Sequence, residues 1–176
     1  MRAKRDSFEE FVAQYDRDKA LTYRRSDGGS ALMGAMANKD PSSRVRIANL
    51  LLDDGADAAV VATSDNVNVL HVLFGRPQEH DFQAEAALVK RLLEGGADIN
   101  LQSPRFGCPV ECLANMAATD DELAPLYEVV FSRPDIDFDV VVNAARGVTL
   151  RDYLVGMGRP DLPRLARAYD EAHPSS

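Results

Sequence analysis

The sequence has no tryptophan, only two cysteines and no long uninterrupted apolar run. A membrane-spanning helix needs about 18 consecutive apolar residues, and no stretch of this chain approaches that length. Where a signal peptide would have an apolar core, the chain has Arg5, Glu9 and Glu10. These absences predict a cytoplasmic protein that does not associate with a membrane.

Positive charge is also scarce. Lys and Arg number 20 against 28 Asp and Glu, which gives a formal net charge of -8. Nucleic acids and anionic lipids attract proteins through Lys/Arg clusters, so this balance argues against both and favours a basic protein partner. One basic cluster, Lys4, Arg5, Arg24 and Arg25, is interleaved with acidic residues and is interpreted as a solvated mixed-charge surface.

The most informative feature that the sequence does contain is an internal repeat. The chain has 176 residues with 45% hydrophobic composition, which predicts one folded domain. Within it, Ile47–Asp57 (IANLLLDDGAD) returns roughly 40 residues later as Val89–Asp98 (VKRLLEGGAD), and in degraded form as Tyr127–Asp137. Gly55, Gly95 and Gly96 are predicted to be left-handed helix ends.

Each copy follows a helix-start signal and a shorter apolar segment. Asp40 with Pro41, Asp81, and Thr119 with Glu122 have the residue types and spacing of helix N-termini. The shorter segments are Ser30–Asn38, Asn68–Phe74, Pro109–Ala117 and Thr149–Val155. The repeating unit is therefore predicted to be a pair of helices.

Both ends of the chain carry a capping signal. An apolar stripe in Ser7–Leu21, formed by Phe8, Phe11, Val12 and Tyr15, predicts one N-terminal helix that closes the first unit. Pro160–Ala172 has a similar stripe beneath a polar surface. These segments are expected to shield the core at the two ends.

Four short segments open the units, three of them beginning with glycine: Gly28–Leu32, Asn66–His71, Gly107–Val110 and Gly147–Leu150. With the Leu-Leu and Gly-Ala-Asp helix ends, they resemble ankyrin repeats over roughly residues 25 to 172. The resemblance implies an all-α solenoid of about four helix-turn-helix units, with an N-terminal capping helix and a C-terminal capping repeat. The implied division is a cap at 1–24, repeats at 25–62, 63–102 and 103–142, and a capping repeat at 143–176.

The units are longer than ankyrin repeats usually are. They measure roughly 40 residues against about 33. The additional residues lie between the paired helices, at 39–43 and 76–81. These loops are expected to protrude on one face.

The resemblance also implies where a partner binds. Ankyrin solenoids use hairpin tips and a concave face formed by the inner helices. The positions that correspond are Arg24, Arg25, Ser64, Asp65, Asn66, Arg105, Phe106, Asn143 and Arg146 at the tips, and Asn38 and Asn115 on the inner helices. Arg105 and Phe106 are favoured as the main contacts because exposed Arg and aromatic residues dominate interfaces, although Phe106 packed against its own turn is an equal alternative.

An enzyme is the alternative of a different class. It would pair Cys108 or Cys112 with His71 or His80 as a Cys/His nucleophile. Against it, His71 stands where ankyrin repeats keep a structural histidine that hydrogen-bonds the neighbouring turn, and His80 lies in a polar loop as a solvated side chain. Both cysteines are expected to be buried thiols, and no second Cys/His pair completes a zinc site.

The sequence thus favours a non-catalytic protein-binding module, a monomer when free, with no cofactor, metal or nucleic acid. One form of this hypothesis is an inhibitor or immunity-type protein, because an acidic surface suits occlusion of a basic active site. The abundance of Ala, Arg, Asp, Val and Gly is typical of a high-GC bacterium. An adaptor, a scaffold or a regulatory subunit is the other form.

Overall fold

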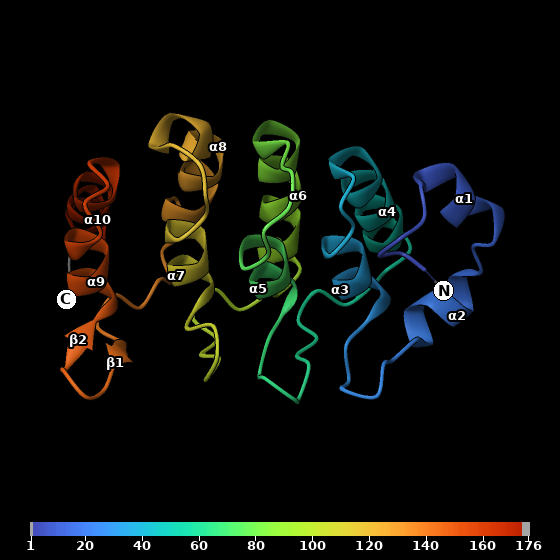
Figure 1. Cartoon of the computed structure of the whole chain (residues 1–176), viewed down its shortest axis with the longest axis horizontal. Helices are drawn as coiled ribbons and strands as arrows, with labels where there is room; N and C mark the ends of the chain where they lie inside the picture. Colours follow the sequence, from blue (N-terminus) through green and yellow to red (C-terminus); the bar gives the residue numbers. More distant parts are fainter. Residues whose placement is uncertain (1, 174–176) are drawn as a thin grey trace.

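The computed structural model describes residues 2–173, and this part of the chain is mostly helical. Ten helices and two short strands occur in it, arranged as an elongated row of helix pairs with the termini at opposite ends (Figure 1). The elements are α1 (Phe8–Ala13), α2 (Arg17–Thr22), α3 (Ala31–Met36), α4 (Pro41–Asp53), α5 (Val69–Phe74), α6 (Phe82–Glu94), α7 (Pro109–Ala114), α8 (Asp120–Phe131), β1 (Val141–Asn143), β2 (Val148–Thr149), α9 (Leu150–Gly156) and α10 (Asp161–Ala172). The predicted all-α class is confirmed, with one small two-stranded sheet added. None of the described helices is long and apolar enough to cross a membrane.

One unit occurs four times after the N-terminal helices. It begins with a tight turn, closed by a backbone bridge in Arg24–Ser30, Ala62–Val67 and Ser103–Gly107, or by β1 pairing with β2. A short helix follows (α3, α5, α7 or α9), then a connecting loop and a long helix (α4, α6, α8 or α10). The predicted boundaries at 25, 63, 103 and 143 all fall within these turns.

Local signals explain where the long helices begin and end. Asp40 and Asp81 cap α4 and α6, because each carboxylate accepts a hydrogen bond from a backbone N–H three residues later. The same helices are followed by Gly55 and Gly96, whose φ angles of 95° and 94° lie in the left-handed region. Gly95 was expected there too, but its φ of -80° is ordinary because it still belongs to the helix end.

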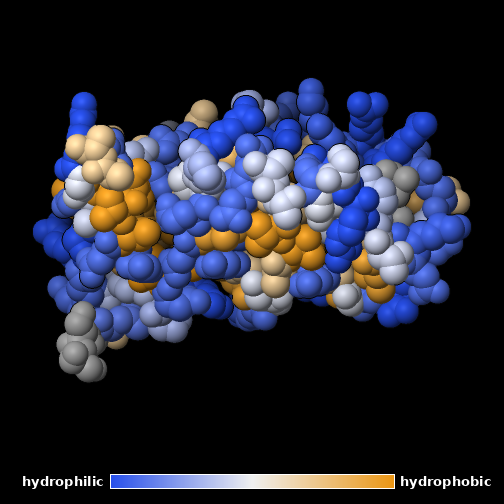
Figure 2. Space-filling view, turned by 90° about the horizontal axis from the view of Figure 1, so that it is seen from below, coloured by the Kyte–Doolittle hydropathy of each residue, from blue (hydrophilic) through white to orange (hydrophobic). Residues whose placement is uncertain are grey.

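The helices form two layers. The short helices contact one another in the order α3, α5, α7 and α9, and the long helices in the order α4, α6, α8 and α10. The apolar core lies between the layers and between neighbouring units, where Leu51, Leu92 and Leu126 are fully buried. Seen from the side of the turns, hydrophobic side chains lie along the middle of the molecule and hydrophilic ones along its edges (Figure 2).

Hydrogen bonds between successive turns hold the units in register. The Thr63 N–H donates to the Asp27 carbonyl over 2.8 Å, and Asn66 Nδ2 donates to the Gln102 carbonyl over 2.7 Å. Asn66 also has a φ of 52°, a left-handed conformation that asparagine adopts more readily than most residues. This predicted contact residue therefore has a structural role in its turn.

A buried ion pair joins the first two units. Arg44 on α4 and Glu85 on α6 are fully buried, with Arg44 Nε 2.7 Å from Glu85 Oε1. Arg44 also donates to the carbonyls of Asn38 and Glu79. The loop at 76–81 was expected to protrude, but it folds back over the first unit because the buried guanidinium needs backbone acceptors.

His80 was expected to be a solvated loop residue, but the structure places it against the buried ion pair. Its side chain is only 8% exposed, and Nδ1 lies 2.7 Å from Glu85 Oε2. The ring stacks on Phe82 with 5.2 Å between centroids. The prediction of a solvated histidine was wrong because the loop follows the buried carboxylate inward.

The two ends differ in detail from the sequence expectation. The N-terminal cap is two helices, because Asp16 caps a second start at Arg17 and breaks the stripe. Phe11 is buried as expected, whereas Val12 is 45% exposed. The pairing of β1 with β2 before α9 was not predicted.

Candidate binding groove

Three adjoining hollows follow the short helices and turns. The first, of about 530 Å³, lies beside the N-terminal segment and α3. The second, of about 330 Å³, lies between the first two turns and α5, and the third, of about 400 Å³, lies between α5 and α7. Arg76 lines all three, and Arg105 and Phe106 line the last two. Because neighbouring hollows share lining residues, they form a row across three units, and this row is called the groove.

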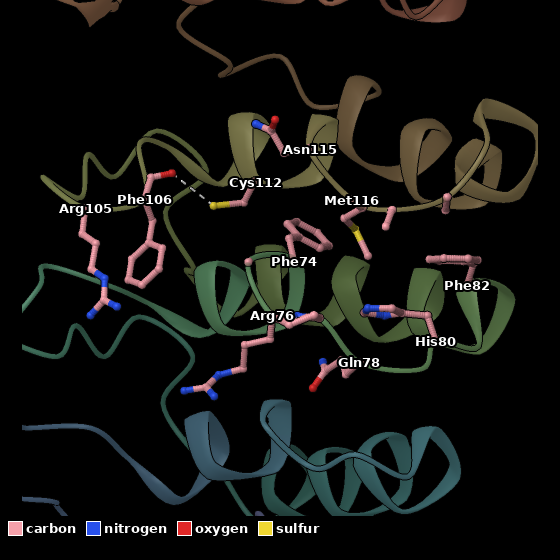
Figure 3. Close-up of a pocket in the computed structure, with 14 residues that line it drawn as sticks. Phe74, Arg76, Gln78, His80, Phe82, Arg105, Phe106, Cys112, Asn115 and Met116 are labelled. Carbon is pink, nitrogen blue, oxygen red and sulfur yellow. Dashed lines mark hydrogen bonds between the residues drawn. The ribbon is translucent and has the colours of Figure 1, made fainter.

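The third hollow is the apolar end of the groove. Phe74, Phe82 and Met116 form its wall, and Phe106 stands at its margin with 36% of its surface exposed (Figure 3). The Arg105 guanidinium lies over the Phe106 ring, 5.0 Å from its centroid. An aromatic–arginine pair, partly exposed, therefore lines this end of the groove.

The turn beneath Phe106 is rigidly held. Cys112 Sγ donates to the Phe106 carbonyl over 3.3 Å, and the Cys108 N–H donates to Glu111 over 2.7 Å. Gly107 has a φ of 70°, and a side chain there would meet the Glu111 carboxylate. These contacts hold the backbone of the turn that carries Phe106.

The first hollow is the basic end of the groove. Arg2, Lys4, Arg5, Arg25 and Arg76 line it, and no Asp or Glu is among the described residues that do so. The pKa of Lys4 is lowered, first by the nearby Arg76, then by partial burial and by further cations. Lys4, Arg5 and Arg25 were interpreted as a mixed-charge surface, but the acidic residues between them in sequence do not line this hollow.

Five of the eleven predicted contact residues meet in the second hollow: Arg25, Ser64, Asp65, Arg105 and Phe106. Asn115 is exposed and lines the third hollow, although its Nδ2 already donates to the Tyr153 hydroxyl. Exposed positions outside the three hollows are Arg24, Asn66, Asn143 and Arg146.

Asn38 does not lie where the sequence analysis predicted it. It is 3% exposed, and its Nδ2 donates to the carbonyls of Ala3 and Asp6 over 2.9 Å each. Ankyrin register placed it on the inner helix, but it follows α3 and fastens the N-terminal segment to the first unit. Its side-chain amide is therefore occupied by structural contacts.

The groove also contains residues that sequence reasoning missed. Arg76 follows α5 and extends away from α7, as Arg105 does (Figure 3). Its position in a loop between paired helices hid its role. The signal available was an arginine directly after an apolar helix end, at Phe74-Gly75-Arg76.

Both cysteines are buried, and within the described residues no hydrogen bond joins either of them to a histidine. Burial raises the pKa of Cys108 to about 11 and that of Cys112 to about 12. His71 Nε2 lies 2.9 Å from the Gly107 carbonyl and Nδ1 accepts from the Asn68 N–H, so within the described residues its nitrogens are occupied by structural contacts. Burial also lowers the pKa of His71. Among residues 2–173, no cluster of three or more His, Cys, Asp or Glu side chains has the arrangement of a metal site.

Comparison with known proteins gives a fold relationship. No protein-family model matches the sequence, and no curated protein matches it. Among solved structures, the chain is similar to a functionally unknown protein from Leptotrichia buccalis, with 21% identity and a TM-score of 0.74. The match covers 99% of this chain and 93% of the other. The row of helix pairs is therefore an architecture that a solved protein shares over nearly its whole length.

Proposed function

We propose that this chain is an ankyrin-type solenoid that binds another protein in the groove and catalyses no reaction. The observation that carries the proposal is the row of adjoining hollows across three units, lined by the Arg105–Phe106 pair. The fourfold order of turn, short helix and long helix supports the ankyrin assignment. So does His71, whose ring hydrogen-bonds the next turn.

The groove has the features of a protein interface. Hot spots are enriched in aromatic and Arg residues set in pockets, with polar surroundings that exclude water. Phe106 and Arg105 supply such an anchor, and the fixed turn beneath them lowers the ordering cost of binding. Neighbouring helices pack about 10 Å apart, so three units present about 30 Å of groove.

Absence of catalysis is proposed from the chemistry of the groove. A cysteine nucleophile needs thiolate character and access, whereas both thiols are buried with raised pKa values. Alkylation of the folded protein at neutral pH should therefore be much slower than alkylation of the urea-unfolded chain. Fast modification of the folded protein would favour the Cys/His enzyme instead.

The biological role is proposed at the level of binding: an inhibitor or immunity-type protein, or alternatively an adaptor, scaffold or regulatory subunit. We propose a cytoplasmic monomer. The net charge of -8 predicts that the partner protein as a whole is basic, and this stays a prediction. The acidic excess is concentrated in residues 107–176, which contain 12 Asp/Glu and 6 Lys/Arg.

The test needs a partner, purified from the native host by affinity capture and measured by calorimetry. Phe106→Ala and Arg105→Ala should each weaken binding about tenfold, mainly through faster dissociation. Matched controls outside the groove are Val12→Ala on α1 and Arg164→Ala on α10, both exposed. Binding that survives both groove substitutions but is lost in the controls would place the interface on the outer surface.

A further inference from the structure

The groove carries charge of the opposite sign to the rest of the protein. Six Lys/Arg residues and two Asp residues line the three hollows. The whole chain has the reverse balance, with 20 Lys/Arg and 28 Asp/Glu. The six cations are Arg2, Lys4, Arg5, Arg25, Arg76 and Arg105.

The cations of the groove differ in whether a carboxylate neutralises them. Arg25 pairs with Asp27, and Arg105 lies 3.9 Å from Asp65. Within residues 2–173, by contrast, neither Lys4 nor Arg76 has a carboxylate oxygen within 4.0 Å. The two lie close enough for Arg76 to be the main cause of the lowered pKa of Lys4. Like charges held together destabilise each other, and a bound anion would relieve that repulsion.

We propose that the groove binds an acidic, extended segment of the partner protein, whose carboxylates contact Arg76 and Lys4 and whose apolar side chain packs against Phe106. This rests on the proposed function and specifies the chemistry of its partner. The order of the hollows sets the order of the segment, with acidic residues beside the N-terminal unit and an apolar anchor between α5 and α7. About nine extended residues span about 30 Å.

A protein segment fits this surface better than a nucleic acid. A polyanion would extend beyond the basic hollow and approach the acidic remainder of the chain, where residues 107–176 carry twice as many acidic as basic side chains. The apolar third hollow has a wall of Phe74, Phe82 and Met116. An acidic segment with one apolar anchor complements both ends.

The test is selection of short random peptides, displayed on phage, against the full folded chain. We expect enrichment of peptides that combine several Asp or Glu residues with an aromatic or aliphatic residue. A synthetic, fluorescein-labelled copy of the most enriched peptide is then titrated by fluorescence anisotropy. Arg76→Gln should weaken its binding about tenfold, the effect of one charged hydrogen bond, and added salt should weaken it further.

The matched control is Lys90→Gln on α6, which removes the same charge at a side chain that is 67% exposed and does not line any of the three hollows. It should leave binding within about twofold, as screened surface charges do. Equal losses in Arg76→Gln and Lys90→Gln would overturn the proposal, because only net charge would then matter.

The other outcomes separate the two proposals. Neutral or basic peptides whose binding is lost in Phe106→Ala would overturn the acidic segment and leave the groove as a protein-binding site. Acidic peptides whose affinity is unchanged by both Phe106→Ala and Arg76→Gln would show that the groove is not the binding site. No enrichment, or tighter binding of a fluorescein-labelled oligothymidine than of any selected peptide, would overturn the acidic segment.

Discussion

Two junctions between repeated units share one plan but differ in burial. At the first, Arg44 on α4 pairs with Glu85 and donates to the carbonyls of Asn38 and Glu79. At the other, Arg159 before α10 lies 3.0 Å from Asp120 and donates to the carbonyls of Met116 and Ala118. Each arginine therefore joins a carboxylate and a loop of the neighbouring unit.

The difference lies in solvent access. Both side chains of the first pair are 0% exposed, whereas those of Arg159 and Asp120 are 19% and 11% exposed. Removing one partner of a fully buried pair leaves a charge with no water to solvate it. The same contacts should therefore contribute much more to the free energy of unfolding at the first junction. That junction also holds the loop that carries Arg76.

The largest effect is expected from Arg44→Met. Loss of the guanidinium strands the buried Glu85 carboxylate and two backbone carbonyls, and should lower the free energy of unfolding by about 3–5 kcal/mol. Urea denaturation followed by circular dichroism measures it. The control is Arg46→Met on the same helix, whose pair with Glu9 is exposed and should contribute less than about 1 kcal/mol. Equal costs for the two substitutions would refute the comparison.

A double variant separates the stranded charge from the pair itself. Arg44→Met with Glu85→Leu removes both charges, and should recover part of the stability lost in the single variant, since a buried pair replaced by apolar groups is often close to neutral. No recovery would mean that the carbonyls of Asn38 and Glu79, rather than Glu85, account for the loss.

The apolar packing should not differ between the junctions. Leu51, Leu92 and Leu126 lie on three successive long helices and are all fully buried. Replacement of each by Ala should cost about 2–5 kcal/mol, measured by the same denaturation. A variant at Leu51 or Leu92 that melts like the wild type would show that its side chain is not packed between units.

A smaller effect is expected from Arg159→Met. The pair is partly exposed, so water replaces some of the lost hydrogen bonds, and the cost should be about 1–2 kcal/mol. Arg164→Met, three residues into α10 with its side chain 70% exposed, is the matched control. A loss as large as that of Arg44→Met would mean that burial does not set the difference.

The sequence predicted the helix pairs because their signals are local. Caps such as Asp40 and Asp81, glycines at helix ends and apolar periodicity all act within a few residues. Arg44 and Glu85 gave no such signal, because a charged helical residue is ordinarily read as solvent-facing and its partner lies 41 positions away. The strands β1 and β2 are too short to show an alternating pattern.

The candidate groove was predicted only in part for the same reason. Arg25, Arg105 and Phe106 were found because turn positions repeat along the sequence. Lys4 and Arg76 join them only when the N-terminal segment packs on the first unit and the loop after α5 folds back. Those contacts depend on stacking, which a one-dimensional pattern does not contain.

The last prediction concerns pH at the more exposed junction. Partial burial disfavours the charged form of Asp120, but the Asp161 N–H and the Arg159 guanidinium outweigh it and hold its pKa below the usual range. Because the folded-state pKa is the lower one, this contribution to stability is present above the unfolded pKa of about 3.9 and is lost as pH falls below it. Other carboxylates titrate in the same range, so the useful quantity is the difference in unfolding free energy between the wild type and Asp120→Asn. That difference should be constant from neutral pH to about pH 5 and shrink below about pH 4. A difference that stays unchanged through the acid range would mean that the Asp120 charge does not stabilise this junction.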